Sequence, residues 1–178
     1  EWNFVPADYA KLDREGMFTR QAGMPGAAFD AAVLIALQDA RVDIATFYTG
    51  TNLVYGLFNA YGTPHKAYYT FLAFRRLLDC PDRLALENAG VGDTWALAGI
   101  STDRTMVRVL ISNPGPAKTV RLDLKNLPWS GEAGCEKQVL TTEHSLDSVA
   151  TQAVSGSDIV VTESIEGVSV CLLTIKSN

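Results

Sequence analysis

The segment from Arg41 to Asp79 constrains the possible folds of this chain more than any other stretch. It opens on β-branched and aromatic residues that predict a strand buried on both faces: Val42, Ile44, Thr46, Phe47 and Tyr48. A loop rich in turn residues follows Gly50, and Thr63 with Pro64 then predicts the start of a helix. The segment is therefore predicted to form a strand, a loop and a helix that ends before Pro81.

A second helix is predicted upstream, over Gly26 to Ala40. Its apolar residues recur at the spacing of one buried helical face: Phe29, Ala32, Val33, Ala36, Leu37 and Ala40. Before it, Pro6 to Pro25 is predicted as one long loop, and Glu1 to Val5 as the end of a strand. The first part of the chain thus alternates between strand and helix, which predicts parallel strands joined by helical crossovers.

After Pro81 the sequence changes to short segments in which apolar and polar residues alternate. The series begins with Leu84, Leu86, Trp95, Leu97 and Ile100. Further strands are predicted over residues 106–111, 120–125, 137–142, 159–162 and 168–175. Clusters of Gly, Pro, Asp and Ser separate them, and such spacing is typical of an antiparallel β-sandwich. We therefore expect an α/β part over residues 1–80 and an all-β sandwich over residues 81–178.

The overall charge argues against two classes of partner. The chain carries a net charge of -5 and has a pI near 5.0, so no basic stripe is available to replace the counterions of nucleic acid or to bind an anionic membrane surface. Its most apolar run, Ala27 to Leu37, is too short to span a bilayer and contains Asp30. We expect neither nucleic acid nor a membrane as a partner.

The cysteines and histidines give no metal motif. Cys80, Cys135 and Cys171 are widely spaced and fit neither a zinc site nor a disulfide scaffold, so we expect buried thiols, with one disulfide as the alternative. His65 and His144 are too few for a multi-histidine site. No metal or other cofactor is expected.

The first residue and the predicted element order indicate a larger protein. The sequence opens on Glu1, without an initiator Met or a signal peptide. Two βα units cannot close a barrel or form a stable open sheet by themselves. We therefore expect an N-terminal part of the domain outside this sequence; the compartment stays open, with an extracellular or periplasmic location slightly favoured.

Two motifs resemble a known enzyme family. Residues 1–3 read EWN and residues 56–71 read GLFNAYGTPHKAYYTF, and the last predicted strand reads VSVCLLTI over residues 168–175. Together they resemble the end of a (β/α)8 glycoside hydrolase of clan A, most closely glycoside hydrolase family 39, the β-xylosidase and α-L-iduronidase family. The resemblance implies the last βα units of a TIM barrel followed by a C-terminal sandwich, and a glycoside or oligosaccharide substrate.

The resemblance also implies a retaining mechanism with Glu1 as the catalytic nucleophile at the end of the seventh strand. The second carboxylic acid of such an enzyme follows the fourth strand, and no matching segment is present here. Asn3 would bond the nucleophile or a sugar hydroxyl. Tyr48, where the family usually has Trp, would pack against the sugar, with Trp2 and Phe47 as further substrate-binding candidates.

Several alternatives remain open at this stage. The sandwich could instead be a non-catalytic carbohydrate-binding or structural module, and families 30 and 51 also join a clan A barrel to a sandwich. Trp95 and Trp129 are read either as a sugar platform or as core residues. Asp30 and Asp43 are expected to be solvated or capping charges, and His65 to be a surface residue.

Overall fold

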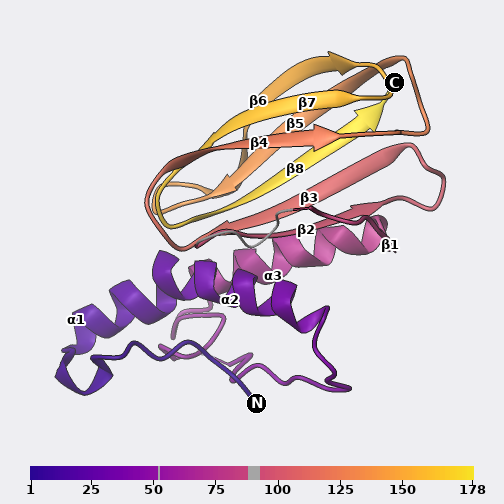
Figure 1. Cartoon of the computed structure of the whole chain (residues 1–178). Helices are drawn as coiled ribbons and strands as arrows, with labels where there is room; N and C mark the ends of the chain where they lie inside the picture. The colour runs from indigo at the N-terminus through magenta and orange to yellow at the C-terminus, as the bar shows by residue number, and fades with distance from the viewer. Residues whose placement is uncertain (52, 88–92) are drawn as a thin grey trace.

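The computed structural model describes residues 1–51, 53–87 and 93–178 as a layer of helices packed against two antiparallel sheets (Figure 1). The longer helices are α2 (Met24–Leu37) and α3 (Lys66–Arg76). Short helical turns precede or follow them: η1 (Tyr9–Lys11), α1 (Arg14–Met17), η2 (Phe18–Ala22) and η3 (Leu77–Asp79). The N-terminal segment runs below these helices in Figure 1, on the side away from the sheets.

The described strands form one large and one small sheet. The large sheet has six strands in the order β1-β2-β3-β8-β5-β6: β1 (Asp82–Arg83), β2 (Trp95–Ile100), β3 (Met106–Asn113), β8 (Ser169–Ser177), β5 (Glu132–Leu140) and β6 (Ser145–Ser155). The small sheet pairs β4 (Lys118–Leu124) with β7 (Ile159–Ile165). Every named strand pair is antiparallel, as the alternating pattern after Pro81 predicts.

Two hydrophobic clusters hold the layers together. The first lies between the sheets, where Val107, Val109 and Ile111 of β3 meet Ile159 and Val161 of β7. The second lies on the opposite face of the large sheet, where the helices pack against it. Its members come from α2, α3 and η3 and from β2, β3, β5, β6 and β8, and include Ala27, Ala31, Ala73, Leu97, Leu110 and Leu172. The large sheet is therefore buried on both faces, and its central strands are apolar in both registers.

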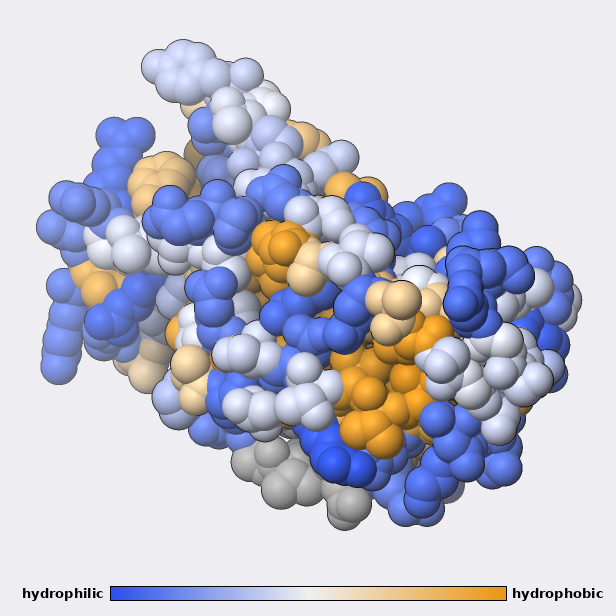
Figure 2. All heavy atoms as spheres, turned by 90° about the horizontal axis from the view of Figure 1, so that it is seen from above, coloured by the Kyte–Doolittle hydropathy of each residue, from blue (hydrophilic) through white to orange (hydrophobic). Residues whose placement is uncertain are grey.

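The side away from the helices is mainly hydrophilic. Figure 2 views the molecule from that side and shows hydrophobic side chains gathered in one main patch over the sheets, with hydrophilic residues around it. β6 lies at the edge of the large sheet and is exposed along most of its length. This exposure explains why the sequence did not predict β6: its residues lack a buried face and therefore lack apolar alternation.

The predicted strand over residues 42–48 is wrong. Its backbone forms one isolated parallel bridge, between Trp2 and Phe47, and Ile44 is 82% exposed. A strand buried on both faces needs neighbours on both sides, and the described residues supply a partner on one side only. The β-branched residues therefore lie in an irregular, largely exposed segment.

The helix at Gly26–Ala40 exists, but its boundaries and buried face differ from the prediction. α2 begins at Met24 with Pro25 in its first turn. Its most buried apolar residues are Ala27, Ala28, Ala31 and Ile35, and of the predicted set only Ala32 is buried. Phe29 is exposed. α2 is apolar almost all round, so sequence periodicity could not identify the face that meets the sheet.

The long loop predicted over Pro6–Pro25 is also partly wrong, because most of it is helical. Asp13 starts α1 as an N-cap, since its side chain accepts a hydrogen bond from the Gly16 amide at 2.8 Å. The helix predicted to start at Thr63 and Pro64 is α3. Its N-cap residue is His65, which makes no side-chain hydrogen bond to the helix, so Thr63 is not the cap.

The three cysteines are buried free thiols, and all of them lie in the described part of the chain, which confirms the first of the two alternatives. Burial raises the pKa of Cys171 to about 12. Among the described residues, every helix is too short or too polar to cross a bilayer.

Candidate active site

The candidate site begins where the N-terminal residues run beside the 46–48 segment. The Trp2 amide donates to the Thr46 carbonyl at 2.9 Å, and the Tyr48 amide donates to the Trp2 carbonyl at 3.0 Å. These two bonds make the parallel bridge between Trp2 and Phe47. The parallel direction agrees with the βα alternation predicted for this part of the chain.

Asn3 ties three segments together through its side-chain amide. Its Nδ2 donates to the carbonyl oxygen of Tyr48 and, at 3.0 Å, to that of Tyr55. Its Oδ1 accepts from Nε2 of Gln21 at 3.5 Å, and the same Nε2 donates to the Phe4 carbonyl at 2.7 Å. Both N–H bonds of the Asn3 amide are thus used on backbone, so in this structure Asn3 orders the site rather than offering a free donor.

Trp2 and Phe47 are committed to packing. The Trp2 and Phe47 rings meet edge to face with centroids 5.0 Å apart, and both contact Phe71 of α3, at 6.2 and 4.9 Å. All three residues are partly buried. Their rings anchor the 1–3 and 46–48 segments to α3, which leaves Tyr48 as the candidate with a free ring face.

Tyr48 is 51% exposed, and its ring centroid lies 6.3 Å from that of Tyr55. The peptide bond between Tyr48 and Thr49 is cis. Glu1 is exposed and precedes the residue that pairs with Phe47, so Glu1 and Tyr48 belong to the same pair of neighbouring segments. The sequence prediction grouped these residues, and the structure brings their segments side by side.

The loop between this site and α3 is held by His65, which sequence analysis predicted as a surface residue. His65 is partly buried: its Nδ1 lies 2.9 Å from the Gly56 carbonyl, and its ring contacts Phe18 at 6.1 Å. Asn59 closes the turn within the loop, since its Oδ1 accepts from the amides of Tyr61 and Thr63, each at 2.9 Å. The GLFNAYGTP motif therefore forms an ordered loop between the site and α3 and does not supply a catalytic group.

The comparisons with known proteins bear on the fold. No protein-family model matches the chain, and no curated protein matches it. A glucosidase from Croceicoccus marinus superposes on 99% of the chain with a TM-score of 0.75 and 20% identity. A family 39 glycoside hydrolase from Xanthomonas axonopodis pv. citri superposes on 87% with a TM-score of 0.67 and 13% identity, and a family 30 endoxylanase from Clostridium papyrosolvens on 88% with 0.65 and 12%.

The chain shares the fold of these glycoside hydrolases. It spans less than half the length of each: 45% of the glucosidase, 41% of the family 39 enzyme and 39% of the endoxylanase. The identities are too low to carry residue roles across, so the glycoside hydrolase fold is the finding, and the assignment of individual side chains rests on the geometry described above.

One buried residue of α2 contradicts its sequence prediction. Asp30 was expected to be a solvated or capping charge, but it is 2% exposed within α2. Its Oδ1 has no hydrogen-bond partner among the residues that the structure describes, and desolvation raises the pKa of this carboxyl to about 8. In the sequence, the only sign of this burial is a single Asp inside an apolar helix. The same pattern is equally typical of a helix in which one position faces solvent.

The two tryptophans of the β region differ in environment. Trp129 is partly buried against the cluster between the sheets, and its Nε1 has no hydrogen-bond partner within the described part of the chain. It is therefore a core residue, as one of the two alternatives predicted. Trp95, the first residue of β2, is 39% exposed. Of these two tryptophans, Trp95 is the more exposed.

Proposed function

We propose that this chain is the C-terminal part of a retaining glycoside hydrolase, in which Glu1 is the nucleophile and Tyr48 contacts the sugar. The parallel pairing of Trp2 with Phe47 carries the proposal, because it aligns the end of one barrel strand with its neighbour. Residues 1–80 then belong to a TIM barrel, and residues 81–178 form an accessory β-sandwich. Catalytic groups of such barrels gather at the ends of the strands, where Glu1 and Tyr48 lie in this proposal.

The chemistry follows from the position of the carboxylate. Glu1 attacks the anomeric carbon, its oxygen forms a bond to that carbon, and the glycosidic oxygen leaves with a proton from a second carboxylic acid. The covalent intermediate is then hydrolysed by a water from which the second carboxylate takes a proton. In a retaining enzyme the two carboxyl groups lie about 5–5.5 Å apart. The second acid belongs, in this proposal, to the barrel part that precedes Glu1.

Exposed apolar residues support a barrel that extends beyond these residues. Val5, Val42, Ile44 and Leu53 are each more than half exposed. On α2, the face away from the sheet carries Phe29 with the partly buried Val33 and Leu37. Extensive exposed apolar surface is typical of a surface that packs against further structure.

The nucleophile can be tested by trapping. A 2-deoxy-2-fluoroxylosyl fluoride slows breakdown of a glycosyl-enzyme intermediate, so peptide mapping of the complete protein should find the sugar on the peptide that contains Glu1. Glu1→Gln should lower hydrolysis of aryl xylosides and glucosides by at least about a thousandfold, because the amide is a poor nucleophile. In Glu1→Ala, which leaves space for an anion beside the anomeric carbon, added azide should restore turnover and yield a glycosyl azide of inverted configuration.

Glu132→Gln is the matched control, since Glu132 is an exposed carboxylate at the start of β5. It should hydrolyse at the wild-type rate. Hydrolysis by Glu1→Gln at a rate near wild type, or a label on any other carboxylate, would exclude Glu1 as the nucleophile. A complete protein with no hydrolysis of any aryl glycoside tested would favour the non-catalytic module instead.

A further inference from the structure

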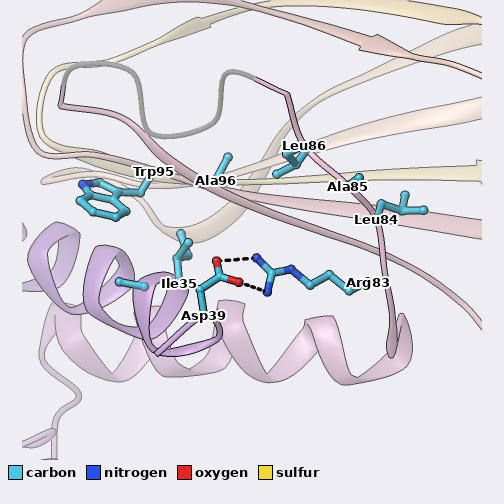
Figure 3. A pocket seen from close by; sticks show the side chains of 9 residues that line it. Ile35, Asp39, Arg83, Leu84, Ala85, Leu86, Trp95 and Ala96 are labelled. Carbon is cyan, nitrogen blue, oxygen red and sulfur yellow. Dashed lines mark hydrogen bonds and ion pairs between the residues drawn. The ribbon is translucent and has the colours of Figure 1, made fainter. Parts of the chain in front are cut away.

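A pocket of about 530 Å³ lies between the end of α2 and the first two strands of the large sheet (Figure 3). Its walls are mainly apolar, with Ile35 and Ala36 from α2 and Leu84, Leu86 and Ala96 from the strand side. Its polar groups are the side chains of Asp39 and Arg83, and its aromatic group is Trp95. In Figure 3, Trp95 lies at one end of the pocket and Arg83 at the other, with Asp39 between them.

Trp95 has a side-chain face that the helices do not cover. Along β2, residues 95, 97 and 99 point to one face of the sheet, and Leu97 on that face is buried in the cluster beneath the helices. Trp95 shares that face but is 39% exposed and lines the pocket with Ile35 and Ala36. An exposed indole at the rim of a hollow offers a flat apolar surface at low conformational cost.

The polar group opposite Trp95 is an ion pair that uses both oxygens of Asp39. Arg83 donates from Nη1 to Oδ1 at 2.6 Å and from Nη2 to Oδ2 at 2.8 Å. The hydrogen bond from Arg83 lowers the pKa of Asp39, so the carboxylate stays ionised at neutral pH. Both side chains remain accessible, so the pair still presents free guanidinium N–H donors and free carboxylate lone pairs.

This combination selects a neutral ligand that carries both donors and acceptors. The two charges neutralise each other, which disfavours a free phosphate or a free amine as the ligand. Hydroxyl groups can accept from the guanidinium and donate to the carboxylate at the same time. A sugar ring has such hydroxyls around its edge and an apolar face of C–H groups that fits a tryptophan ring. A protein partner would need a buried area near 800 Å² on each side, far more than this hollow provides, by about the usual size of stable interfaces.

We infer that the pocket formed by Trp95, Asp39 and Arg83 is a second glycan-binding site, which holds two or three pyranose rings of a neutral oligosaccharide. The pocket volume lies within the range of small-molecule sites, about 300–1,000 Å³. The helical layer separates it from Glu1 and Tyr48, because the N-terminal segment runs on the far side of α2 and α3 from the sheets (Figure 1). The site goes beyond the proposed function, since it binds part of an oligosaccharide without cleaving it.

The test titrates the complete protein with xylohexaose and follows its indole N–H signals in a nitrogen–proton correlation spectrum. The protein carries Glu1→Gln so that the ligand is not cleaved. The signal that disappears in Trp95→Ala identifies Trp95, and this signal should shift on addition of xylohexaose or cellohexaose. Trp95→Ala should raise the dissociation constant by about tenfold or more, which is the effect of losing one aromatic contact and its apolar area. Trp95→Phe should lie between the two, and thermal melting checks that both variants fold.

Tyr61→Ala is the matched control, because it removes an aromatic ring that is 93% exposed and outside the pocket lining. It should bind as the wild type does. Arg83→Met should weaken binding several-fold, as it removes the donors but keeps most of the apolar stem. Wild-type affinity in a folded Trp95→Ala, or tighter binding of oligogalacturonate than of xylohexaose, would overturn the inference.

The two proposals fail independently. Loss of xylohexaose binding in Tyr48→Ala, with Trp95→Ala unaffected, would place the glycan at the proposed active site and overturn the second site only. Absence of binding for both hexasaccharides would also overturn the second site and leave the trapping experiment on Glu1 unaffected. Binding at Trp95 in a complete protein that lacks hydrolysis would support the second site and count against the proposed function.

Discussion

Trp2 and Phe47, which are far apart in sequence, pair as neighbouring parallel segments, and their rings meet edge to face with centroids 5.0 Å apart. The backbone bridge fixes the two segments in register, and the ring contact with Phe71 attaches them to α3. A single parallel bridge is weak by itself, because two strands without further neighbours are marginally stable. The side chains around the bridge therefore supply much of its stability.

Asn3 should be the most sensitive of these side chains. Asn3→Ala removes the donors that Tyr48 and Tyr55 accept on their carbonyl oxygens and the acceptor of Gln21. We expect a loss of about 1–2 kcal/mol in the local opening free energy of this segment, because the carbonyl groups of Tyr48 and Tyr55 each lose the hydrogen bond from Asn3. Amide hydrogen exchange should show it: the amides of Trp2 and Tyr48 exchange faster, and those of β3 and β8 do not change.

Asn178→Ala is the control for this change, since Asn178 is an exposed amide at the other end of the chain. It should leave exchange at Trp2 and Tyr48 as in the wild type. If Asn3→Ala left the amides of Trp2 and Tyr48 as protected as in the wild type, the hydrogen bonds of the Asn3 side chain would contribute nothing to the order of the site.

Asp30 should make the stability of the fold fall as pH rises. Its pKa is raised by burial from 3.8 to about 8, so between these values the unfolded chain loses a proton that the folded chain keeps. The unfolded state then binds fewer protons, and the free energy of unfolding falls by about 1.4 kcal/mol per pH unit across this range. Below about pH 4 the effect is absent, and above about pH 8 it is complete.

Asp30→Asn isolates this effect, because the amide is close in shape to the protonated acid and does not titrate. The variant and the wild type should unfold at similar urea concentrations near pH 4, and the variant should be more stable by about 4 kcal/mol near pH 7. The measurement compares the unfolding free energies of the two proteins at each pH. Asp39, Asp79 and Asp147 have lowered pKa values, so they make stability rise with pH, but they do so equally in both proteins. A constant difference across this pH range would show that Asp30 is solvated.

The central strands of the large sheet could be predicted because burial on both faces leaves a pattern of apolar positions in their sequence. Val107, Val109 and Ile111 face the cluster between the sheets, while Leu110 faces the helices, and both registers are visible as apolar positions. The small sheet has one face in the core and one face in solvent. Along β4, the partly buried Val120, Leu122 and Leu124 therefore alternate with exposed residues. Where the environment of a residue is set by its own strand and neighbours, the sequence pattern is sufficient.

Ile44 and Asp30 show why the rest could not be predicted. Ile44 lies in a segment with strand-like composition, but a strand is stable only when other segments bond its backbone, and that is a tertiary property. Asp30 occupies an apolar helix whose buried side is decided by the packing of α3 and the sheet, which periodicity does not report. The pairing of Asp39 with Arg83 is likewise invisible in sequence, because it joins residues from two separate elements.

The last prediction concerns the contact between the sheets. Lys137 of β5 and Glu163 of β7 form an ion pair with Nζ and Oε2 3.0 Å apart, and their side chains are 14% and 13% exposed. Lys137 also donates to the Ser164 carbonyl at 2.7 Å, and Gln152 donates to Glu163 at 3.2 Å. Lys137→Met should cost about 3 kcal/mol of unfolding free energy, because it leaves the Glu163 charge nearly buried without its partner.

Replacing both partners should recover much of that loss. Lys137→Met combined with Glu163→Leu leaves no unpaired charge, so we expect the double variant to regain at least half of the stability lost in Lys137→Met alone. The exposed pair of Arg121 and Asp123 on β4 is the control, and Arg121→Met should change stability by less than about 0.5 kcal/mol. Urea unfolding of five proteins measures these differences: the wild type, Lys137→Met, Glu163→Leu, the double variant and Arg121→Met. A double variant as unstable as the sum of its two single changes would mean that Lys137 and Glu163 are not coupled.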